Sequence, residues 1–224
     1  MSKYLFTSRS GGMSKPPFNG RNLATHVGDD PECVSENREG LAAELGVESD
    51  RLFFMNQSHG SEIIEINELS RASDVRNCDA MITRAAGTAL AVLVADCAPL
   101  LLLGERTSAA VHVGWRGLFG GIVEKVLALM GSERFSAVIG PTICGKCYVI
   151  GDDLLSDASR RGFVIGNKTL DIPASIMGIL RESSGGRLES AQWDGSCTFE
   201  NSSFYSYRRD QVTGRQAGVV IHGT

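Results

Sequence analysis

Apolar residues gather in the middle of the chain in three runs that are typical of buried β-strands. The runs are residues 90–95, 100–103 and 109–113. Short runs of this kind, rich in valine and leucine, predict strands buried on both faces. Asp96 and Cys97 follow the first run, and His112 lies near the end of the third. Because a buried ionisable group is costly unless it is paired or bound to a metal, these strand ends predict a functional site.

Capping residues and helical periodicity mark the elements around these runs. A helix is predicted from Pro31 to Gly46, because Asp30 suits the cap, proline the first helical position and glycine the end. Apolar residues at helical spacing predict another helix from Leu118 to Leu129, stopped by Gly131. Strands are expected over residues 3–7, 51–55, 62–66 and 136–140, helices over residues 152–161 and 173–182, and strand-like runs over residues 203–222. The chain therefore mixes strands and helices along its length.

Composition narrows the class of protein. The chain has 224 residues, enough for one domain with a full core. A net charge of -4 and a pI near 5.6 argue against binding to nucleic acid or to an anionic membrane. The N-terminus lacks the apolar segment of a signal peptide, and the most apolar run, residues 88–103, is too short to span a bilayer. Six cysteines without a secretory signal predict reduced thiols and a cytoplasmic protein.

Two histidines and one cysteine suggest a metal site or a nucleophile. His59 closes an apolar segment in the same way as Cys97 and His112 do. Two imidazoles and a thiolate match a catalytic zinc set, in which three protein ligands leave one position for water or substrate. A thiolate ligand suits zinc or copper better than magnesium or calcium. The same residues also suit metal-free catalysis in which His112 deprotonates Cys97, and spacing alone does not separate the two.

A glycine-rich turn, Gly114–Gly117, joins the third apolar run to the helix predicted from Leu118. Free backbone N–H groups and the positive end of a helix dipole at such a turn favour an anion, and Arg116 would add a clamp for phosphate or carboxylate. Arg208 and Arg215 could belong either to a solvated surface or to a second anion clamp. Arg9 precedes two glycines, which suit either a plain surface turn or a backbone that a ligand approaches closely.

Cys144 and Cys147 form a Cys-x-x-Cys pair, which is typical of a redox disulfide or of half a zinc knuckle. A knuckle needs a second pair of ligands, and Cys78 and Cys197 each stand alone in the sequence. The segment after Cys147 looks extended, whereas a redox cysteine sits at a helix N-terminus. We therefore interpret the pair as incidental.

The chain resembles the YfiH-like family in motifs that follow in order along nearly its whole length. The motifs are Phe6–Gly12, Asn22–Leu23, Gly28–Pro31, Gln57–Gly60, Asp79–Ala80, Ala95–Pro99, His112–Gly117, Ile139–Pro141, Cys147–Tyr148, Cys197–Thr198, Tyr207–Arg209 and Thr213–Arg215. The resemblance implies a single α/β domain over residues 1–224, with mixed β-sheets flanked by helices in a layered α/β/β/α arrangement. It also implies zinc as the cofactor, with copper as the alternative.

The resemblance assigns roles to individual residues. The expected metal ligands are His59, Cys97 and His112, the expected catalytic residues are Cys97, His112 and Asp96, and the expected substrate-binding residues are Arg9, Gln57, Arg116, Arg208 and Arg215. Asp96, beside the cysteine, would act as an acid or base or would orient its neighbours.

Members of the family carry the labels laccase domain, multicopper polyphenol oxidase and purine nucleoside phosphorylase, so the resemblance implies competing activities. A type-1 copper with a trinuclear cluster needs many more imidazoles than the four histidines present. Phosphorolysis of adenosine, inosine, guanosine and methylthioadenosine, with adenosine deamination alongside, is therefore favoured, and the partners are a purine nucleoside and phosphate. A metal-free hydrolase using Cys97 (a deamidase or an amidase editing cell-wall precursors) and a copper-dependent polyphenol oxidase stay as alternatives. The oligomeric state is left open.

Overall fold

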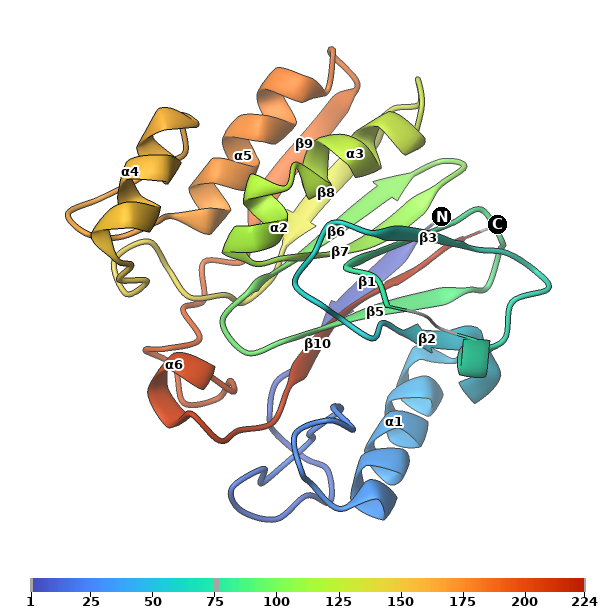
Figure 1. Cartoon of the computed structure of the whole chain (residues 1–224). Helices are drawn as coiled ribbons and strands as arrows, with labels where there is room; N and C mark the ends of the chain where they lie inside the picture. The colour runs from blue at the N-terminus through green and yellow to red at the C-terminus, as the bar shows by residue number, and fades with distance from the viewer. Residues whose placement is uncertain (1, 75–76, 224) are drawn as a thin grey trace.

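Two β-sheets lie face to face between helices in a computed structural model of the chain, which describes residues 2–74 and 77–223 (Figure 1). One sheet has four strands and the other six. One helix covers the outer face of the smaller sheet, and the remaining longer helices cover the outer face of the larger sheet. This layered α/β/β/α arrangement with mixed sheets confirms the expected fold class.

The four-stranded sheet brings the two ends of the chain together. Its strands, in spatial order, are β1 (Lys3–Phe6), β10 (Gln216–Ile221), β5 (Ala89–Val94) and β2 (Leu52–Phe54). β10 runs antiparallel to both β1 and β5, whereas β2 runs parallel to β5. The first apolar run of the sequence is thus a central strand, buried along its whole length as its composition predicts.

The six-stranded sheet contains the other two apolar runs. Its strands, in spatial order, are β3 (Ile63–Ile66), β4 (Ala80–Thr83), β7 (Ser108–Val113), β6 (Ala98–Gly104), β8 (Phe135–Ile139) and β9 (Leu188–Trp193). β6 and β7 form an antiparallel pair in which Pro99 stands opposite His112. The strands β4 and β9 were not expected from the sequence pattern.

Capping residues place the helices largely where the sequence predicts them. The helices are α1 (Pro31–Leu45), α2 (Trp115–Phe119), α3 (Ile122–Leu129), α4 (Asp152–Arg160), α5 (Ile172–Ser183) and α6 (Tyr207–Asp210), with short 3-10 turns at Ser49–Arg51 and Ala72–Asp74. α1 begins with the Asp30 carboxylate accepting a hydrogen bond from the Glu32 N–H, and it ends at Gly46 in the left-handed conformation. Among the described residues, no helix is long and apolar enough to cross a membrane.

Two local predictions are wrong. The helix predicted from Leu118 is two helices, because Gly121 between α2 and α3 has φ 70° and thus cannot continue a right-handed helix. As a result Leu129, expected on the buried stripe, is exposed. The tail is not strand-like around Tyr207, because the Ser206 side chain accepts a hydrogen bond from the Arg209 N–H and caps the short helix α6.

The chain passes from one sheet to the other between β5 and β6. Along β5 the side chains of Leu90, Val92 and Val94 enter the apolar layer between the sheets, while those of Ala89, Ala91 and Leu93 pack in the layer that contains α1. After Val94 the chain turns within three residues into β6 of the larger sheet. Asp96 and Cys97 lie in that crossing, at the edge of the layer between the two sheets. Their position there explains why ionisable residues interrupt an apolar run.

Candidate active site

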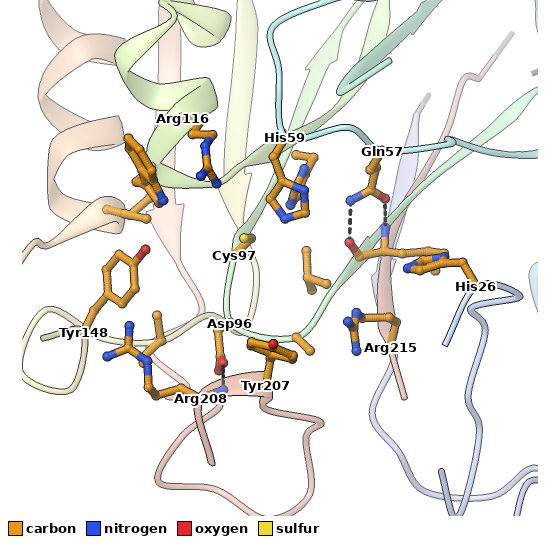
Figure 2. Close-up of a pocket in the computed structure, with 17 residues that line it drawn as sticks. His26, Gln57, His59, Asp96, Cys97, Arg116, Tyr148, Tyr207, Arg208 and Arg215 are labelled. Atoms are coloured by element: carbon orange, nitrogen blue, oxygen red, sulfur yellow. Dashed lines mark hydrogen bonds between the residues drawn. The ribbon is translucent and has the colours of Figure 1, made fainter. Parts of the chain in front are cut away.

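A pocket of about 410 Å³ opens at this crossing (Figure 2). Its lining residues are His26, Gln57, His59, Leu93, Val94, Ala95, Asp96, Cys97, His112, Trp115, Arg116, Ile143, Tyr148, Ile172, Tyr207, Arg208 and Arg215. The fold thus brings together every site residue expected from the sequence except Arg9. The Arg9 guanidinium lies outside the lining, donates to the Asn19 side chain at 2.7 Å and stacks over the Tyr205 ring.

His59, Cys97 and His112 form a group whose ligand atoms all lie within 4.8 Å of one another. Each comes from a different element: His59 from the turn between β2 and β3, Cys97 from the crossing, and His112 from β7. Gly114 allows this close packing, because a Cβ atom there would lie 3.1 Å from the Cys97 sulfur and 3.6 Å from the His59 ring. His59 and Asp96 also have positive φ angles, of 60° and 98°, a strained conformation that tends to cluster at functional sites.

Asp79, which the sequence analysis did not single out, supports two members of this group. Its fully buried carboxylate lies 2.8 Å from Nδ1 of His112 and accepts the backbone N–H groups of His59 and Gly60 at 2.9 and 2.7 Å. These contacts leave Nε2 of His112 for a ligand and fix the turn that carries His59. A charged residue directly before the buried strand β4 is the signal that could have identified Asp79 from the sequence.

Proton sharing within the group favours an ionised thiol. Burial opposes ionisation of Cys97, but the neighbouring His112 and His59 outweigh it and lower the pKa of the thiol to about 6. Burial likewise opposes protonation of His112, but Cys97 and Asp79 outweigh it and raise its pKa to about 9. Burial opposes ionisation of Asp79 too, yet hydrogen bonds from His112 and Gly60 hold its pKa well below the usual range. Both shifts favour the pair in which Cys97 is a thiolate and His112 holds the proton.

The donor set fits a single soft or borderline metal ion. A thiolate and two imidazoles are ligands that zinc and copper accept readily. The other two histidines lie outside the group, because His26 stands elsewhere in the pocket lining and His222 contacts the Ser108 hydroxyl through Nδ1 at 2.9 Å. The site therefore offers two imidazoles to a metal, which suits one ion and not a multicopper cluster.

Asp96 acts as a link between loops. Its two carboxylate oxygens accept hydrogen bonds from the Thr198 hydroxyl at 2.7 Å and from the Arg208 backbone N–H at 2.6 Å. Its backbone carbonyl accepts the Thr142 hydroxyl at 2.7 Å and the Ile143 N–H at 3.0 Å. Because both carboxylate oxygens are occupied, this geometry favours the orienting role over the role of acid or base.

Three arginines face the pocket without a carboxylate partner among residues 2–74 and 77–223. Arg116 stacks over the Trp115 ring, with 4.4 Å from its guanidinium carbon to the ring centroid. Arg208 donates to the Val149 carbonyl at 2.8 Å, and Arg215 to the carbonyls of Thr213 and Gly214. Figure 2 shows Arg116 on one side of the pocket and the other two on the opposite side. Guanidinium groups that form no direct ion pair favour an anionic ligand.

Arg116 and Gln57 line the pocket, but their interactions differ from those expected of an anion-binding helix end and of a substrate-binding side chain. Arg116 lies inside the first turn of α2, which has only five residues, so the helix dipole expected at this turn is small and the guanidinium itself supplies the charge. Gln57 pairs through its side-chain amide with the backbone of Leu93, donating and accepting at 2.8 Å (Figure 2). This pairing ties the turn of His59 to β5.

Aromatic residues complete the lining. Tyr148, Tyr207 and Trp115 present ring faces or edges to the pocket, and Arg208 stacks over the Tyr148 ring at 5.1 Å. Sequence reasoning did not assign these residues or His26 to the site. The available signal was their position within or beside the motifs that carry the family resemblance. Flat rings beside guanidinium groups suit a ligand that has both a planar base and an anionic group.

Comparisons with known proteins find similar sequences over nearly the whole chain. The family model described as multi-copper polyphenol oxidoreductase laccase matches residues 3–223. A protein of Corynebacterium glutamicum named purine nucleoside phosphorylase is 38% identical, with the alignment covering 96% of this chain and 92% of the relative. One from Streptomyces coelicolor with the same name is 37% identical, covering 96% and 93%.

Solved structures show the same fold. A Neisseria meningitidis protein is 30% identical, covers 100% of this chain and 95% of its own, and superposes with a TM-score of 0.86. YlmD from Geobacillus stearothermophilus is 26% identical, covers 100% and 92%, and superposes with a TM-score of 0.88. The mixed sheets flanked by helices are thus shared with proteins solved independently.

Proposed function

We propose that this chain, which belongs to the multi-copper polyphenol oxidoreductase laccase family, is a zinc-dependent purine nucleoside phosphorylase. The support from the comparisons is its similarity to proteins named purine nucleoside phosphorylase. Its substrates would be adenosine, inosine, guanosine and methylthioadenosine, and adenosine deamination would be a second activity of the same pocket. The proposal treats residues 1–224 as one domain and places the enzyme in the cytoplasm, in keeping with six free cysteines.

One observation carries the proposal: Arg116, Arg208 and Arg215 line the same pocket as the group formed by His59, Cys97 and His112. Inorganic phosphate is a small dianion that arginine binds through paired hydrogen bonds. A phosphorylase must hold this anion against the ribose of a bound nucleoside. Arginine side chains without a direct ion pair in the described part of the chain, together with neighbouring aromatic rings, meet both needs.

The proposed reaction transfers the ribosyl group from the purine to phosphate. A phosphate oxygen forms a bond to C1′ of the ribose while the bond between C1′ and the purine nitrogen breaks. The electron pair of that bond leaves with the base, which takes up a proton, and the sugar leaves as its 1-phosphate. Arg116, Arg208 and Arg215 would position the nucleophile, and holding two reactants in one geometry is itself a large part of such catalysis.

His59, Cys97 and His112 would hold the metal, with Asp79 fixing the orientation of His112. When bound, zinc would withdraw electron density from the purine in phosphorolysis and activate water for attack at C6 in deamination. Asp96 would keep Arg208 in place through the bond to its N–H.

Two other activities have weaker support. A copper-dependent polyphenol oxidase needs several copper ions, and four histidines in the chain, of which two lie at the metal group, do not supply them. A metal-free cysteine hydrolase has one specific observation in its favour, because the pKa of Cys97 is lowered to about 6 beside a protonated His112. The unpaired arginines have no evident role in that reaction.

The test is release of free purine from the four nucleosides with and without inorganic phosphate, combined with metal analysis. We expect phosphate-dependent release that a chelator abolishes and zinc restores. Cys97→Ala should lose both the activity and about one zinc per chain, since two ligands remain where catalytic zinc sites use about three. Full activity of the metal-free chain, sensitive to Cys97→Ala, would instead support the cysteine hydrolase, and absence of any phosphate dependence would overturn the phosphorylase.

A further inference from the structure

A second group of metal-ligating side chains lies outside the pocket. The ligand atoms of Cys144, Cys147, Cys197 and Glu200 all lie within 4.8 Å of one another. In the sequence, the Cys144/Cys147 pair is interpreted as incidental because no second pair of ligands stands beside it. The fold supplies a second pair: it places Cys197-x-x-Glu200 directly against Cys144-x-x-Cys147. Two pairs with the same short spacing are typical of a zinc knuckle.

The two pairs come from loops that the backbone holds together. Cys144 and Cys147 lie between β8 and α4, and Cys197 and Glu200 lie between β9 and α6. The Thr142 N–H donates to the Ser196 carbonyl at 3.2 Å, and the Thr198 N–H donates back to the Thr142 carbonyl at 3.1 Å. This small parallel ladder, in which Thr142 pairs with Cys197, sets the two loops side by side just before Cys144. The grouping of the four side chains is therefore built into the backbone.

Each pair closes a tight turn that points its two side chains the same way. The Cys147 N–H donates to the Cys144 carbonyl at 3.0 Å, and the Asn201 N–H donates to the Cys197 carbonyl at 3.0 Å. Gly145 fits the first turn because a Cβ atom there would lie 2.3 Å from the Asp171 carboxylate. The turn is thus pressed against the residue that caps α5 and has little freedom to move.

The ligand atoms already contact one another and the backbone. The Cys144 N–H donates to the Cys197 sulfur at 3.4 Å, a contact that disperses the negative charge of a metal-bound thiolate. The Cys147 sulfur lies 3.4 Å from a Glu200 carboxylate oxygen. Tetrahedral zinc with sulfur ligands at about 2.3 Å requires sulfur atoms roughly 3.8 Å apart, so the group needs only a small contraction to close around an ion.

From this arrangement we infer that Cys144, Cys147, Cys197 and Glu200 bind a zinc ion in a closed, four-ligand structural site. Three sulfurs and one carboxylate are a donor set that zinc takes and that magnesium and calcium do not. With four protein ligands the site leaves no position for a substrate, in contrast to the three-ligand group of the pocket. This site does not depend on the proposed function, and it raises the expected zinc content from about one to about two per chain.

The ion would brace one wall of the pocket. Thr142 and Thr198, which flank the ligands in the two loops, both donate side-chain hydrogen bonds to Asp96. Tyr148 follows the second cysteine directly and stacks with Arg208. Linking the two loops would therefore hold Asp96 and Tyr148, which lie outside the described strands and helices, in place beside Arg208 of α6.

The experiment measures zinc in the full-length Cys97→Ala chain, which lacks a ligand of the pocket group. After loading with zinc under reducing conditions and desalting, this chain should retain about one zinc. Cys97→Ala with Cys144→Ser should retain much less, because the closed set of four ligands is broken. Cys33→Ser is the matched control, since Cys33 lies on α1 outside both groups, and in the Cys97→Ala background it should leave the retained zinc unchanged. Substituting cobalt(II) for zinc should give thiolate-to-metal charge-transfer absorption that Cys144→Ser removes.

A milder variant keeps the inference testable if the cysteine variants fold poorly. Glu200 is exposed, so Glu200→Gln should fold normally and weaken zinc binding about tenfold or more while keeping the thiolate-to-cobalt absorption. Three outcomes would each overturn the site as stated. They are a folded, reduced Cys97→Ala chain that binds no zinc, a folded Cys144→Ser variant that retains its zinc, and a Glu200→Gln variant with unchanged zinc affinity. A disulfide between two of the three cysteines in the natively purified chain would overturn it as well.

Discussion

The guanidinium group of Arg116 has no hydrogen-bond acceptor among the described residues and is held by stacking on Trp115. It is therefore the arginine most available to phosphate. We predict that Arg116→Lys raises the KM for phosphate in adenosine phosphorolysis by roughly ten- to a hundredfold, because about 1.5–3 kcal/mol of charge-assisted hydrogen bonding is lost. Deamination of adenosine, which uses water, should change much less. Initial rates at varied phosphate measure both.

The control for this substitution is Arg134→Lys, an exposed arginine paired with Glu189 away from the pocket. It should leave both activities unchanged. If Arg116→Lys lowers phosphorolysis and deamination equally and also lowers the melting temperature, then Arg116 braces its turn and does not bind phosphate. In that case Arg208 and Arg215 would have to supply the anion contact.

Asp79 is the second residue whose role can be isolated. We predict that Asp79→Asn weakens zinc binding by His59, Cys97 and His112 about ten- to a hundredfold. An amide holds the His112 ring less firmly than a carboxylate does, and it has only one oxygen to accept the N–H groups of the His59 turn. Zinc titration of the chain carrying Cys144→Ser measures this affinity without the second site. Ser58→Ala removes one neutral donor to Asp79 and should change the affinity far less. Equal affinities in Asp79→Asn and the parent chain would contradict the orienting role.

At the scale of elements, the break between α2 and α3 rests on the left-handed conformation of Gly121. A Cβ atom at Gly121 would meet only the Glu124 carboxylate, at 3.7 Å, so the penalty for a side chain comes from the backbone and not from crowding. We predict that Gly121→Ala lowers the free energy of unfolding by about 1–2 kcal/mol. Urea unfolding followed by circular dichroism measures the change.

The same substitution inside α5 should have the opposite sign. Gly178 lies within Ile172–Ser183, and a Cβ atom there meets nothing within 4 Å. Gly178→Ala should therefore raise the free energy of unfolding by about 0.5–1 kcal/mol, since alanine loses less backbone entropy in a helix than glycine. Destabilisation by Gly178→Ala would contradict the open space around Gly178, and unchanged stability in Gly121→Ala would contradict a conformational penalty at Gly121.

At the scale of the whole molecule, His222 joins the two sheets. It follows β10 of the smaller sheet, and its Nδ1 lies 2.9 Å from the hydroxyl of Ser108, which begins β7 of the larger sheet. Burial lowers the pKa of His222 below its ordinary value, although Glu133 partly opposes this. The folded state thus binds this proton more weakly than the unfolded chain. The resulting stability is present above the unfolded pKa, near 6.5, and is lost as the pH falls through the folded pKa.

We predict that His222→Gln, which keeps a hydrogen-bonding side chain near Ser108, makes the free energy of unfolding less dependent on pH between about pH 7 and pH 5. The slopes of the two chains should differ by at most about 1.4 kcal/mol per pH unit, the limit for one proton. Urea unfolding at several pH values in this range measures the slopes. Identical slopes would mean that His222 titrates alike in the folded and unfolded states.

Most of the local elements, and the chemistry available to them, could be predicted from the sequence. The cap at Asp30, the glycine at Gly46 and the three apolar runs predicted α1 and the central strands, because caps and periodicity act within a few residues. The motifs determined the family, and the residue types of His59, Cys97 and His112 indicated the donor set before any geometry was known. Predictions failed where a local signal was overridden, as at Gly121.

Tertiary structure alone decided which of these groups meet. Asp79 reaches His112 across 33 positions of the chain, and Cys144 reaches Cys197 across 53, so no spacing rule could pair them. It also showed that Arg9 is occupied outside the pocket while Arg116 stays available inside it. The physical reason is that ligand groups assemble where strands that are distant in the chain end side by side. That assembly depends on the packing of the apolar layer between the sheets, which involves the whole chain at once.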